Sequence, residues 1–403
     1  MRALSRRKFA TSRCFYSSNS VGSRYSPQRN KHKTQLEGQF VLQDGNCLEN
    51  VVIEWEQWGD ARLPGNRTVL LLPSFSHGSH AASNLDDPRP GWWQHMLGPN
   101  LGINTSSFRV ICPSVLGSPF GTTSPLSINP NTGKPYRATF PQITPADMAV
   151  CHARLLDDLK IEQVHAVIGG SMGGMQALEF AAQFPHKLNR LLAISCTPQT
   201  TPGTVALRHI QRHAILADSG YNSGEYKTGS VLAGMKIARE LGMACYRSRE
   251  EFDARFQWQP IGPTHFTAQT FDVESYMDYQ ATKFARYYDP NCYLLLSKAM
   301  DLMNLGQGYS NLAQGVSRIE CDSFIVGVQQ DQLIPIKEQA TLVDILQSHG
   351  RNSEFVTVNS RLGHDAMFHA QTQKDVFSNL VREFVESKLE EVLLHEVHRY
   401  STL

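Results

Sequence analysis

The sequence predicts an α/β fold in which helices cover both faces of a mostly parallel β-sheet and a helical lid is inserted into the chain. Short apolar runs that favour strands alternate with amphipathic runs that favour helices, which is the order typical of a parallel sheet. This alternation stops between residues 197 and 315, where polar and aromatic helical sequence replaces it, and then resumes. We therefore expect one core built from residues 37–196 and 316–403, interrupted by a lid over residues 197–315.

The first half of the core begins with four predicted strands. Residues 39–42 and 51–58 favour two strands around an Asp-Gly turn. Residues 68–72 and 108–112 form short apolar runs, which are typical of strands covered on both faces. The irregular segment 113–143 follows, and a loop this long inside a compact domain is usually functional.

A helix is expected to begin at Thr144, because threonine caps a helix well, Pro145 suits its first position and Asp147 adds an acid to its first turn. The later elements continue the alternation. They are strands at 164–168, 191–195, 323–328 and 354–358, and helices at 176–184, 337–348 and 375–394.

The stretch from Val164 to Gly174 points most directly to a function. It predicts a buried strand that runs into a sharp turn bearing Ser171, with a helix directly after it. Gly169, Ser171 and Gly173 match the Gly-x-Ser-x-Gly nucleophile elbow of the α/β-hydrolase fold, in which the serine backbone is strained and its neighbours must lack clashing side chains. The same pattern occurs in ordinary glycine-rich turns, but the flanking strand and helix favour a nucleophile.

A serine hydroxyl becomes a nucleophile only when a base removes its proton, and the base needs an acid that orients it. In this fold the acid and then the histidine follow the serine along the chain, and both lie just past strand ends. Asp331 lies just past one predicted strand, whereas Asp322 lies at the wrong end of it. His364 follows the next strand and is preceded by a glycine. We therefore expect Ser171, Asp331 and His364 to form a catalytic triad.

Two backbone N–H groups are expected to form the oxyanion hole. One belongs to Met172, directly after the nucleophile, and the other comes from the loop after residues 68–72, near Phe75. Together with the triad they predict acyl transfer through an acyl-serine in a ping-pong scheme. With water as the acceptor the protein would be a hydrolase, and with another hydroxyl it would be a transferase.

Charge is distributed unevenly along the chain. Residues 1–36 are rich in serine and contain nine of the 38 lysines and arginines but none of the 37 acids. This composition is typical of a mitochondrial transit peptide, and the segment lacks the apolar core of a secretory signal, so we expect a protein of the mitochondrial matrix. The alternative is a disordered basic leader that carries no targeting signal. The rest of the chain has eight more acids than lysines and arginines, which argues against a nucleic-acid partner.

The composition argues against two further kinds of site. No run of about 18 apolar residues exists, so we expect no membrane span. The eight cysteines form no Cys-x-x-Cys pair and no Cys/His spacing that suits zinc, so we expect free thiols and no metal site.

The elbow stretch Gly169–Glu179 resembles that of the homoserine O-acetyltransferase family of α/β-hydrolases, and the resemblance spans roughly residues 38–390. Four other stretches carry it. They are Gly91–Trp93, Pro125–Tyr136, Phe271–Tyr276 and Gly363–Ala366. The resemblance implies transfer of an acyl group from acyl-CoA, used as a co-substrate rather than a bound cofactor, to the side-chain hydroxyl of a small amino acid. It implies the same triad and a homodimer formed through the lid.

The resemblance also implies two residues that bind the acceptor amino acid, Arg212 for its carboxylate and Asp365 for its ammonium group. The chemistry agrees, because a zwitterion in a dry pocket needs one fixed cation and one fixed anion, and arginine offers a bidentate fork. Without the resemblance, Arg212 would be interpreted as a surface helix residue and Asp365 as a helix cap.

One loop departs from the homoserine enzymes, which usually have Leu-Gly-Gly-Cys where this chain has Leu116 followed by Gly117, Ser118, Pro119 and Phe120. If the bulkier Pro119 and Phe120 line the acceptor pocket, they shrink it and favour serine over homoserine. The variant resembles the serine O-acyltransferase branch of the family, several of whose members use succinyl-CoA. One methylene is worth only about 1–3 kcal/mol, so some use of homoserine is expected.

The sequence therefore predicts an acyl-CoA:L-serine O-acyltransferase for cysteine biosynthesis, with succinyl-CoA as the favoured donor and acetyl-CoA second. The alternative within the family is a homoserine O-acetyltransferase for methionine biosynthesis, which acceptor preference distinguishes. An esterase or thioesterase would consume acyl-CoA without an amino acid, and the expected pair Arg212 and Asp365 argues against it. A non-catalytic binding protein is disfavoured by the intact set of Ser, Asp and His.

Overall fold

The computed structural model describes residues 30–386, which are built around an eight-stranded β-sheet. In spatial order the strands are β1 (Lys31–Gln35), β4 (Val52–Trp58), β8 (Arg109–Pro113), β5 (Thr68–Leu72), β9 (Val164–Gly170), β10 (Leu188–Ile194), β11 (Asp322–Val328) and β12 (Ser353–Val358). The first two strands in this order, β1 and β4, are antiparallel to their neighbours, and the other six run parallel to one another.

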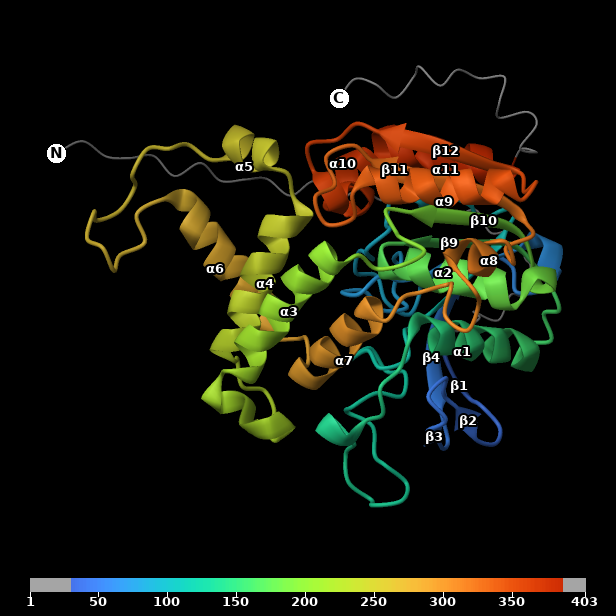
Figure 1. Ribbon diagram of the computed structural model, residues 1–403, viewed down its shortest axis with the longest axis horizontal. Helices are drawn as coiled ribbons and strands as arrows, with labels where there is room; N and C mark the ends of the chain where they lie inside the picture. The colour runs from blue at the N-terminus through green and yellow to red at the C-terminus, as the bar shows by residue number, and fades with distance from the viewer. Residues whose placement is uncertain (1–29, 387–403) are drawn as a thin grey trace, which may run out of the picture.

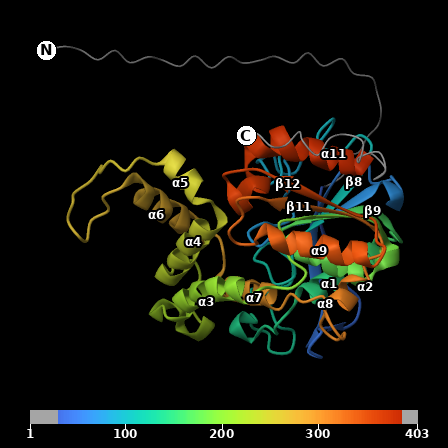
Figure 2. The ribbon, with the colours of Figure 1, turned by 45° about the horizontal axis from the view of Figure 1, so that its top comes forward.

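Helices lie on both faces of the sheet (Figure 2). One face carries α1 (Pro145–Asp158), α2 (Met172–Gln183) and α9 (Ile336–Ser348), and the opposite face carries α11 (Ser378–Glu386). Alternate residues of β5 show why both faces must be covered, since Leu70 packs into the apolar cluster of the first face and Leu71 into that of the second. The mostly parallel sheet between two helical layers confirms the predicted fold class.

The lid helices stand beside the core (Figure 1). They are α3 (Pro202–Leu216), α4 (Ala233–Tyr246), α5 (Arg249–Arg255), α6 (Asp272–Ala285) and α7 (Pro290–Asp301). The short α8 (Leu312–Val316) contacts α9 instead, and residues 256–271, between α5 and α6, extend away from the body of the molecule. No helix within residues 30–386 is long and apolar enough to cross a membrane.

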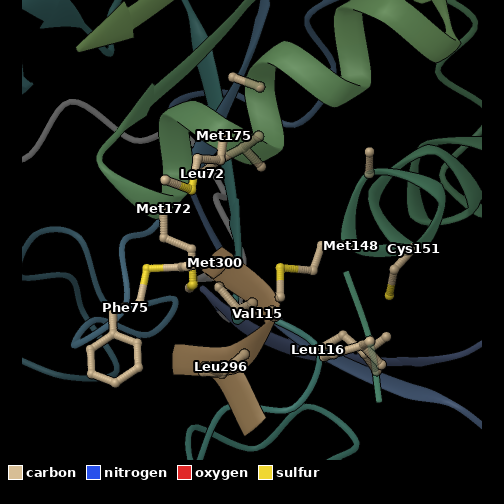
Figure 3. Packing of buried hydrophobic residues seen from close by; sticks show 14 of the residues in the cluster. Leu72, Phe75, Val115, Leu116, Met148, Cys151, Met172, Met175, Leu296 and Met300 are labelled. Carbon is tan, nitrogen blue, oxygen red and sulfur yellow. The ribbon is translucent and has the colours of Figure 1, made fainter. Parts of the chain in front are cut away.

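Helix α7 anchors the lid to the core. Its Leu296 and Met300 are buried in the same apolar cluster as Met172 and Met175 of α2 and Phe75 from the loop after β5 (Figure 3). Sulfur-containing side chains suit this junction, because methionine adapts its shape to irregular gaps. The lid is therefore packed directly against the turn that carries Ser171.

Two sequence expectations differ from the structure. Strand β1 lies inside the segment predicted to be a leader, because its residues pair with β4 and Lys31 forms an ion pair with Glu54 at 2.7 Å. The Asp-Gly turn joins β2 (Phe40–Val41) to β3 (Cys47–Leu48) and not to the strand at 51–58.

Some sequence expectations concern residues outside the described part of the chain. They are the first 29 residues of the predicted leader and residues 387–394 of the last predicted helix.

The remaining short elements are β6 (Leu97–Gly98), β7 (Ile103–Asn104) and α10 (Ala370–Thr372).

Ser171 occupies the sharp turn between β9 and α2. Its φ of 56° and ψ of −122° lie in a region that costs energy for a residue with a side chain. Two glycines let the turn close. A Cβ on Gly169 would stand 2.1 Å from the carbonyl oxygen of Gly173, and a Cβ on Gly173 would stand 2.2 Å from that of Leu72. The turn is therefore pressed against β5, and both glycines are sterically required.

Substituting Gly173→Ala is expected to lower the free energy of unfolding by about 3 kcal/mol or more. The new methyl group would meet the backbone atoms of Leu72 and Pro73, which cannot move aside as a flexible side chain could. Denaturant unfolding measures this change. The matched control is Gly203→Ala in the first turn of α3, where no atom lies within 4 Å, and this variant should be unchanged or up to about 1 kcal/mol more stable. A loss below about 1 kcal/mol in Gly173→Ala would contradict the steric account.

Candidate active site

The structure brings together the three residues that the sequence singles out as a triad. His364 lies in the short helical segment Gly363–Phe368 after β12, and its Nε2 is 2.8 Å from the Oγ of Ser171. Its Nδ1 is 2.7 Å from Oδ2 of Asp331, which follows β11. This geometry lets the imidazole accept the serine proton while the carboxylate fixes the tautomer of the ring.

Asp331 is held rigidly in this arrangement. Its Oδ1 accepts hydrogen bonds from the backbone N–H groups of Leu333 and Ile334, both at 2.9 Å, and the side chain is buried. The rejected candidate Asp322 lies at the start of β11, where it accepts a hydrogen bond from Asn352.

The environment of His364 favours its protonated form. Burial is the largest influence and lowers its pKa, but the negative charge of Asp331 and the hydrogen bond to it act in the opposite direction, and the net shift is upward. An imidazole of raised pKa retains a proton more readily once it has taken it from the serine. This suits a group that acts first as a base and then as an acid.

Gln176 links the two segments that carry the predicted oxyanion donors. Its amide nitrogen donates to the carbonyl oxygens of Pro73 and Met172, both at 3.1 Å, and its Oε1 accepts from Nε2 of His152 at 2.8 Å. Burial lowers the pKa of His152 to about 4, so this contact is made by a neutral ring. Within residues 30–386, the backbone N–H groups of Met172 and Phe75 have no hydrogen-bond acceptor, and both are therefore available to a ligand.

A cavity opens above Ser171 between the core and the lid. Its wall is formed by residues 74–77 of the loop after β5, by side chains from α3, α4 and α7, and by residues 364–369 after β12. Three arginines belong to this wall. They are Arg208 of α3, Arg239 of α4 and Arg247, which follows α4.

Arg212, the expected ligand of an acceptor carboxylate, does not line the cavity. Its guanidinium is instead held by Asp301 at 2.6 Å and by the hydroxyl of Ser297 at 2.9 Å. Arg208, one helical turn earlier, lines the cavity and shares the same carboxylate at 3.2 Å. The buried guanidinium of Arg208, the partly buried one of Arg212 and the single carboxylate of Asp301 leave a net positive charge next to the cavity.

Arg239 is a cation without an anionic partner. Its guanidinium lies over the rings of Tyr246 and Phe284, at 5.8 Å and 4.7 Å from their centroids, and its buried Nε has no hydrogen-bond partner. The described part of the chain offers it no carboxylate within ion-pair distance. A half-buried guanidinium on a cavity wall, with its buried Nε unpaired and no carboxylate beside it, is a good site for an anionic ligand. No motif in the sequence distinguishes Arg239 from the other arginines of the lid.

Asp365 lines the cavity, as expected for a residue that binds an ammonium group. Its Oδ2 is 3.3 Å from Nε of Arg247, which also forms an ion pair with Glu251 at 2.8 Å. An incoming ammonium group can therefore replace Arg247 as the partner of Asp365, while Arg247 keeps its ion pair with Glu251.

The loop Gly117–Phe120 does not line the cavity, so the expectation that it narrows the acceptor pocket directly is not met. Ser118 is fully buried, and Phe120 packs edge-on against Tyr288, with ring centroids 5.8 Å apart. The loop lies one layer behind the cavity wall, because Tyr288 in turn stacks on Phe75.

Comparisons with known proteins agree with this geometry. The family described as alpha/beta hydrolase fold matches residues 67–369. The serine O-succinyltransferase of Litchfieldella anticariensis is 38% identical over 358 residues, which cover 87% of this chain and 97% of that protein. The homoserine O-acetyltransferase of Symbiobacterium thermophilum is 39% identical over 337 residues, which cover 82% and 88%. The solved structure of homoserine O-acetyltransferase from Bacillus anthracis has a TM-score of 0.83 at 27% identity and covers 89% of this chain and 98% of that chain.

The acid limb of the pH profile tests the coupling between His364 and Asp331. The base works only when unprotonated, so acylation of Ser171 by an activated ester should fall as the pH drops through a pKa above that of an ordinary histidine, about 6.5. Asp331→Asn should slow acylation by about 10³–10⁴-fold and move the limb to lower pH, because the ring loses the negative charge of Asp331, and of the influences that raise its pKa only the smaller one of Asp365 remains. Asp322→Asn is the control and should change neither the rate of acylation nor the pH of the limb. An unshifted limb in Asp331→Asn would contradict the assignment of the acid.

Proposed function

This chain belongs to the serine and homoserine O-acyltransferases, a family of acyltransferases with the α/β-hydrolase fold, and we propose that it transfers the acyl group of an acyl-CoA to the hydroxyl of L-serine. Succinyl-CoA is the favoured donor and acetyl-CoA the second, and the product is an activated serine for cysteine biosynthesis. The observation that carries this proposal is the charge pattern of the cavity around Ser171. Arg208 and Arg239 lie at two separate positions on its wall, and the carboxylate of Asp365, which contacts Arg247, lies at a third.

The proposed reaction proceeds in two half-reactions at Ser171. In the first, His364 takes the proton of the serine hydroxyl, Oγ attacks the thioester carbonyl, and the oxyanion accepts hydrogen bonds from the N–H groups of Met172 and Phe75. The C–S bond then breaks, and the CoA sulfur leaves with the proton held by His364. In the second, the acceptor hydroxyl gives its proton to His364 and attacks the acyl-serine, and Ser171 recovers the proton as it leaves.

The acceptor is held at its two charged groups. Arg239, in place of Arg212, is proposed to bind the carboxylate, because it lines the cavity and its charge is uncompensated. Asp365 is proposed to bind the ammonium group by exchanging its contact with Arg247. An acceptor fixed at both ends can present its hydroxyl to the acyl group ahead of water, which favours transfer over hydrolysis.

A dicarboxylic acyl group needs a further cation at its distal end. Arg208 supports this role, because it lines the cavity and the cluster that it forms with Arg212 and Asp301 has one positive charge in excess. An acetyl group has no charge there and would leave that excess uncompensated. This is the physical reason to favour succinyl-CoA over acetyl-CoA.

Serine is preferred to homoserine in this proposal on the basis of the loop Gly117–Phe120. Relatives named for each substrate match the chain with nearly equal identity, 38% and 39%. The loop lies behind the cavity wall, where Phe120 packs against Tyr288, so it supports this preference through its resemblance to the serine O-acyltransferase branch and not through contact with the acceptor. Homoserine O-acetylation remains the alternative that the assays below distinguish.

We also propose that the lid joins two copies of the chain. Four exposed apolar side chains lie on three lid helices. They are Ile210, Leu216, Ile237 and Tyr279. Sedimentation should give a dimer for the wild type and a monomer for Ile237→Glu, and a monomeric wild type at all concentrations would contradict this.

The proposed location is the mitochondrial matrix, on the basis of the basic, acid-free composition of residues 1–36. Residues 1–29 alone should direct a fused fluorescent protein to mitochondria, and cytosolic fluorescence would contradict the proposal. The fusion ends before β1, because that strand belongs to the core sheet.

An assay of CoA release on residues 30–403 tests the proposed substrates. L-Serine and L-homoserine are each combined with succinyl-CoA and acetyl-CoA, with a control that contains no amino acid. We expect the highest kcat/KM for serine with succinyl-CoA and slow release without an acceptor. A preference for homoserine with acetyl-CoA would support the alternative, and equal release without an amino acid would support a thioesterase.

Arg208→Gln and Arg239→Gln should affect different substrates. The first should lower kcat/KM for succinyl-CoA by about 10²-fold and leave that for acetyl-CoA within about threefold, because one charge-assisted contact to the distal carboxylate is lost. The second should raise the KM for the amino acid by a similar factor with either donor. Equal losses for both donors in Arg208→Gln would contradict its role.

A further inference from the structure

We infer that the Tyr288 hydroxyl is a positioning group for the oxyanion donor at Phe75, and that the loop Gly117–Phe120 influences the reaction through it. Tyr288 lies between α6 and α7, in the lid, and its Oη donates a hydrogen bond to the carbonyl oxygen of Phe75 at 2.7 Å. Both residues are buried. The lid thus makes a direct, directional contact with the backbone of the loop that completes the oxyanion hole.

The side chain of Phe75 is held as firmly as its carbonyl group. Its ring stacks on Tyr288, with centroids 5.3 Å apart, and meets the ring of Tyr293 edge-on at 4.9 Å. With the ring enclosed and the carbonyl oxygen bonded, rotation about the Phe75 backbone is restricted. The direction of its N–H group is therefore fixed before the substrate binds, which is the condition for an effective oxyanion donor.

The loop is attached at two points that belong to different parts of the fold. Gln176 of the core donates to the carbonyl oxygen of Pro73 at 3.1 Å, whereas Tyr288 of the lid donates to that of Phe75. The loop also forms a turn over residues 74–77, which the N–H group of His77 closes by donating to the carbonyl oxygen of Ser74 at 3.1 Å. Loss of the Tyr288 hydrogen bond frees the lid-side attachment and leaves the core-side attachment intact.

Tyr288 is a permanent donor. Burial raises the pKa of its hydroxyl well above the ordinary range, so the proton stays in place at any working pH. A buried phenol needs an acceptor, and the Phe75 carbonyl is the acceptor that the described structure gives it. Phenylalanine would fill the same space without the hydrogen bond.

Phe120 connects the variant loop to this contact. Its ring packs edge-on against Tyr288 at 5.8 Å, and a Cβ on Gly78 would stand 2.8 Å from the Cβ of Phe120. Phe120 therefore supports both Tyr288 and the far end of the oxyanion loop. This explains how a loop that does not line the cavity can affect the reaction.

The variant Tyr288→Phe tests the inference, which rests on the proposed acyl-enzyme chemistry. We expect kcat to fall about 10-fold, less than the 10²–10³-fold cost of removing an oxyanion donor outright, while the KM for the amino acid stays within about twofold. The loss should be equal for succinyl-CoA and acetyl-CoA, because both form the same oxyanion. Single-turnover acylation of Ser171 by p-nitrophenyl acetate should slow by the same factor.

The matched control is Tyr221→Phe, which removes another buried lid hydroxyl, bonded to Asn291 at 2.9 Å. Its melting temperature should fall about as much as that of Tyr288→Phe, while its kcat stays at the wild-type value. Equal kcat values for Tyr288→Phe and the wild type, or a similar kcat loss in both variants, would overturn the inference.

Phe120→Leu tests the second half of the inference. It should lower kcat for all substrates by a smaller factor than Tyr288→Phe and leave the KM for the amino acid unchanged. A change confined to the KM of the acceptor would show instead that the loop acts on the acceptor pocket. The ester assay keeps this inference separate from the proposed substrates, because acylation by p-nitrophenyl acetate needs neither serine nor CoA.

Discussion

The structure depends on one strained turn, in which Ser171 is held at a φ of 56° between β9 and α2. The turn can close only because Gly173 meets the Leu72 carbonyl oxygen of β5 without a side chain between them. This contact places the nucleophile next to the loop that leaves β5, and so brings together the two segments that carry the proposed oxyanion donors, Met172 and Phe75. The order of the strands supplies the other partners, because β11 and β12 follow β10 in the sheet and bring Asp331 and His364 to the same edge.

In the proposed function, the lid gives the acyl-transfer centre its specificity. The core alone contains what an esterase needs, namely a nucleophile, a base, an acid and oxyanion donors. Helices α3 and α4 add cations at two different places, one beside Asp301 and one with no carboxylate of residues 30–386 within ion-pair distance. Since a charge removed from water is costly unless a partner compensates it, these two arginines support the proposal that the substrates carry carboxylates. The same lid holds the loop after β5 through the hydrogen bond of Tyr288 to Phe75, so the proposed recognition and catalytic roles fall on one structural unit.

The sequence predicted the core and the close approach of Ser171, Asp331 and His364 well, because both follow from local rules. A Gly-x-Ser-x-Gly turn between a strand and a helix, and polar residues just past strand ends, can be recognised without knowing how distant segments pack. The lid arginines could not be assigned in this way. Arg208 and Arg212 lie one turn apart on α3 and both contact Asp301 of α7, and which of them lines the cavity depends on how α3 packs against distant segments.

Two other misjudged segments also depend on long-range contacts. Strand β1 has a polar sequence with no apolar periodicity, and it is a strand because its backbone pairs with β4 and its lysines pair with Glu54. The loop Gly117–Phe120 would narrow the acceptor pocket only if it lined the cavity, and the structure places Phe75 and Tyr288 between the two.

The most direct test of this account is the mass of the enzyme after mixing with succinyl-CoA in the absence of an amino acid. The account predicts that the peptide containing Ser171 gains one succinyl group, that CoA is released in equal amount, and that added L-serine removes the group as O-succinylserine. Release of CoA only when serine is also present, with no acylated Ser171 at any time, would contradict the acyl-enzyme and therefore the role given to the strained turn.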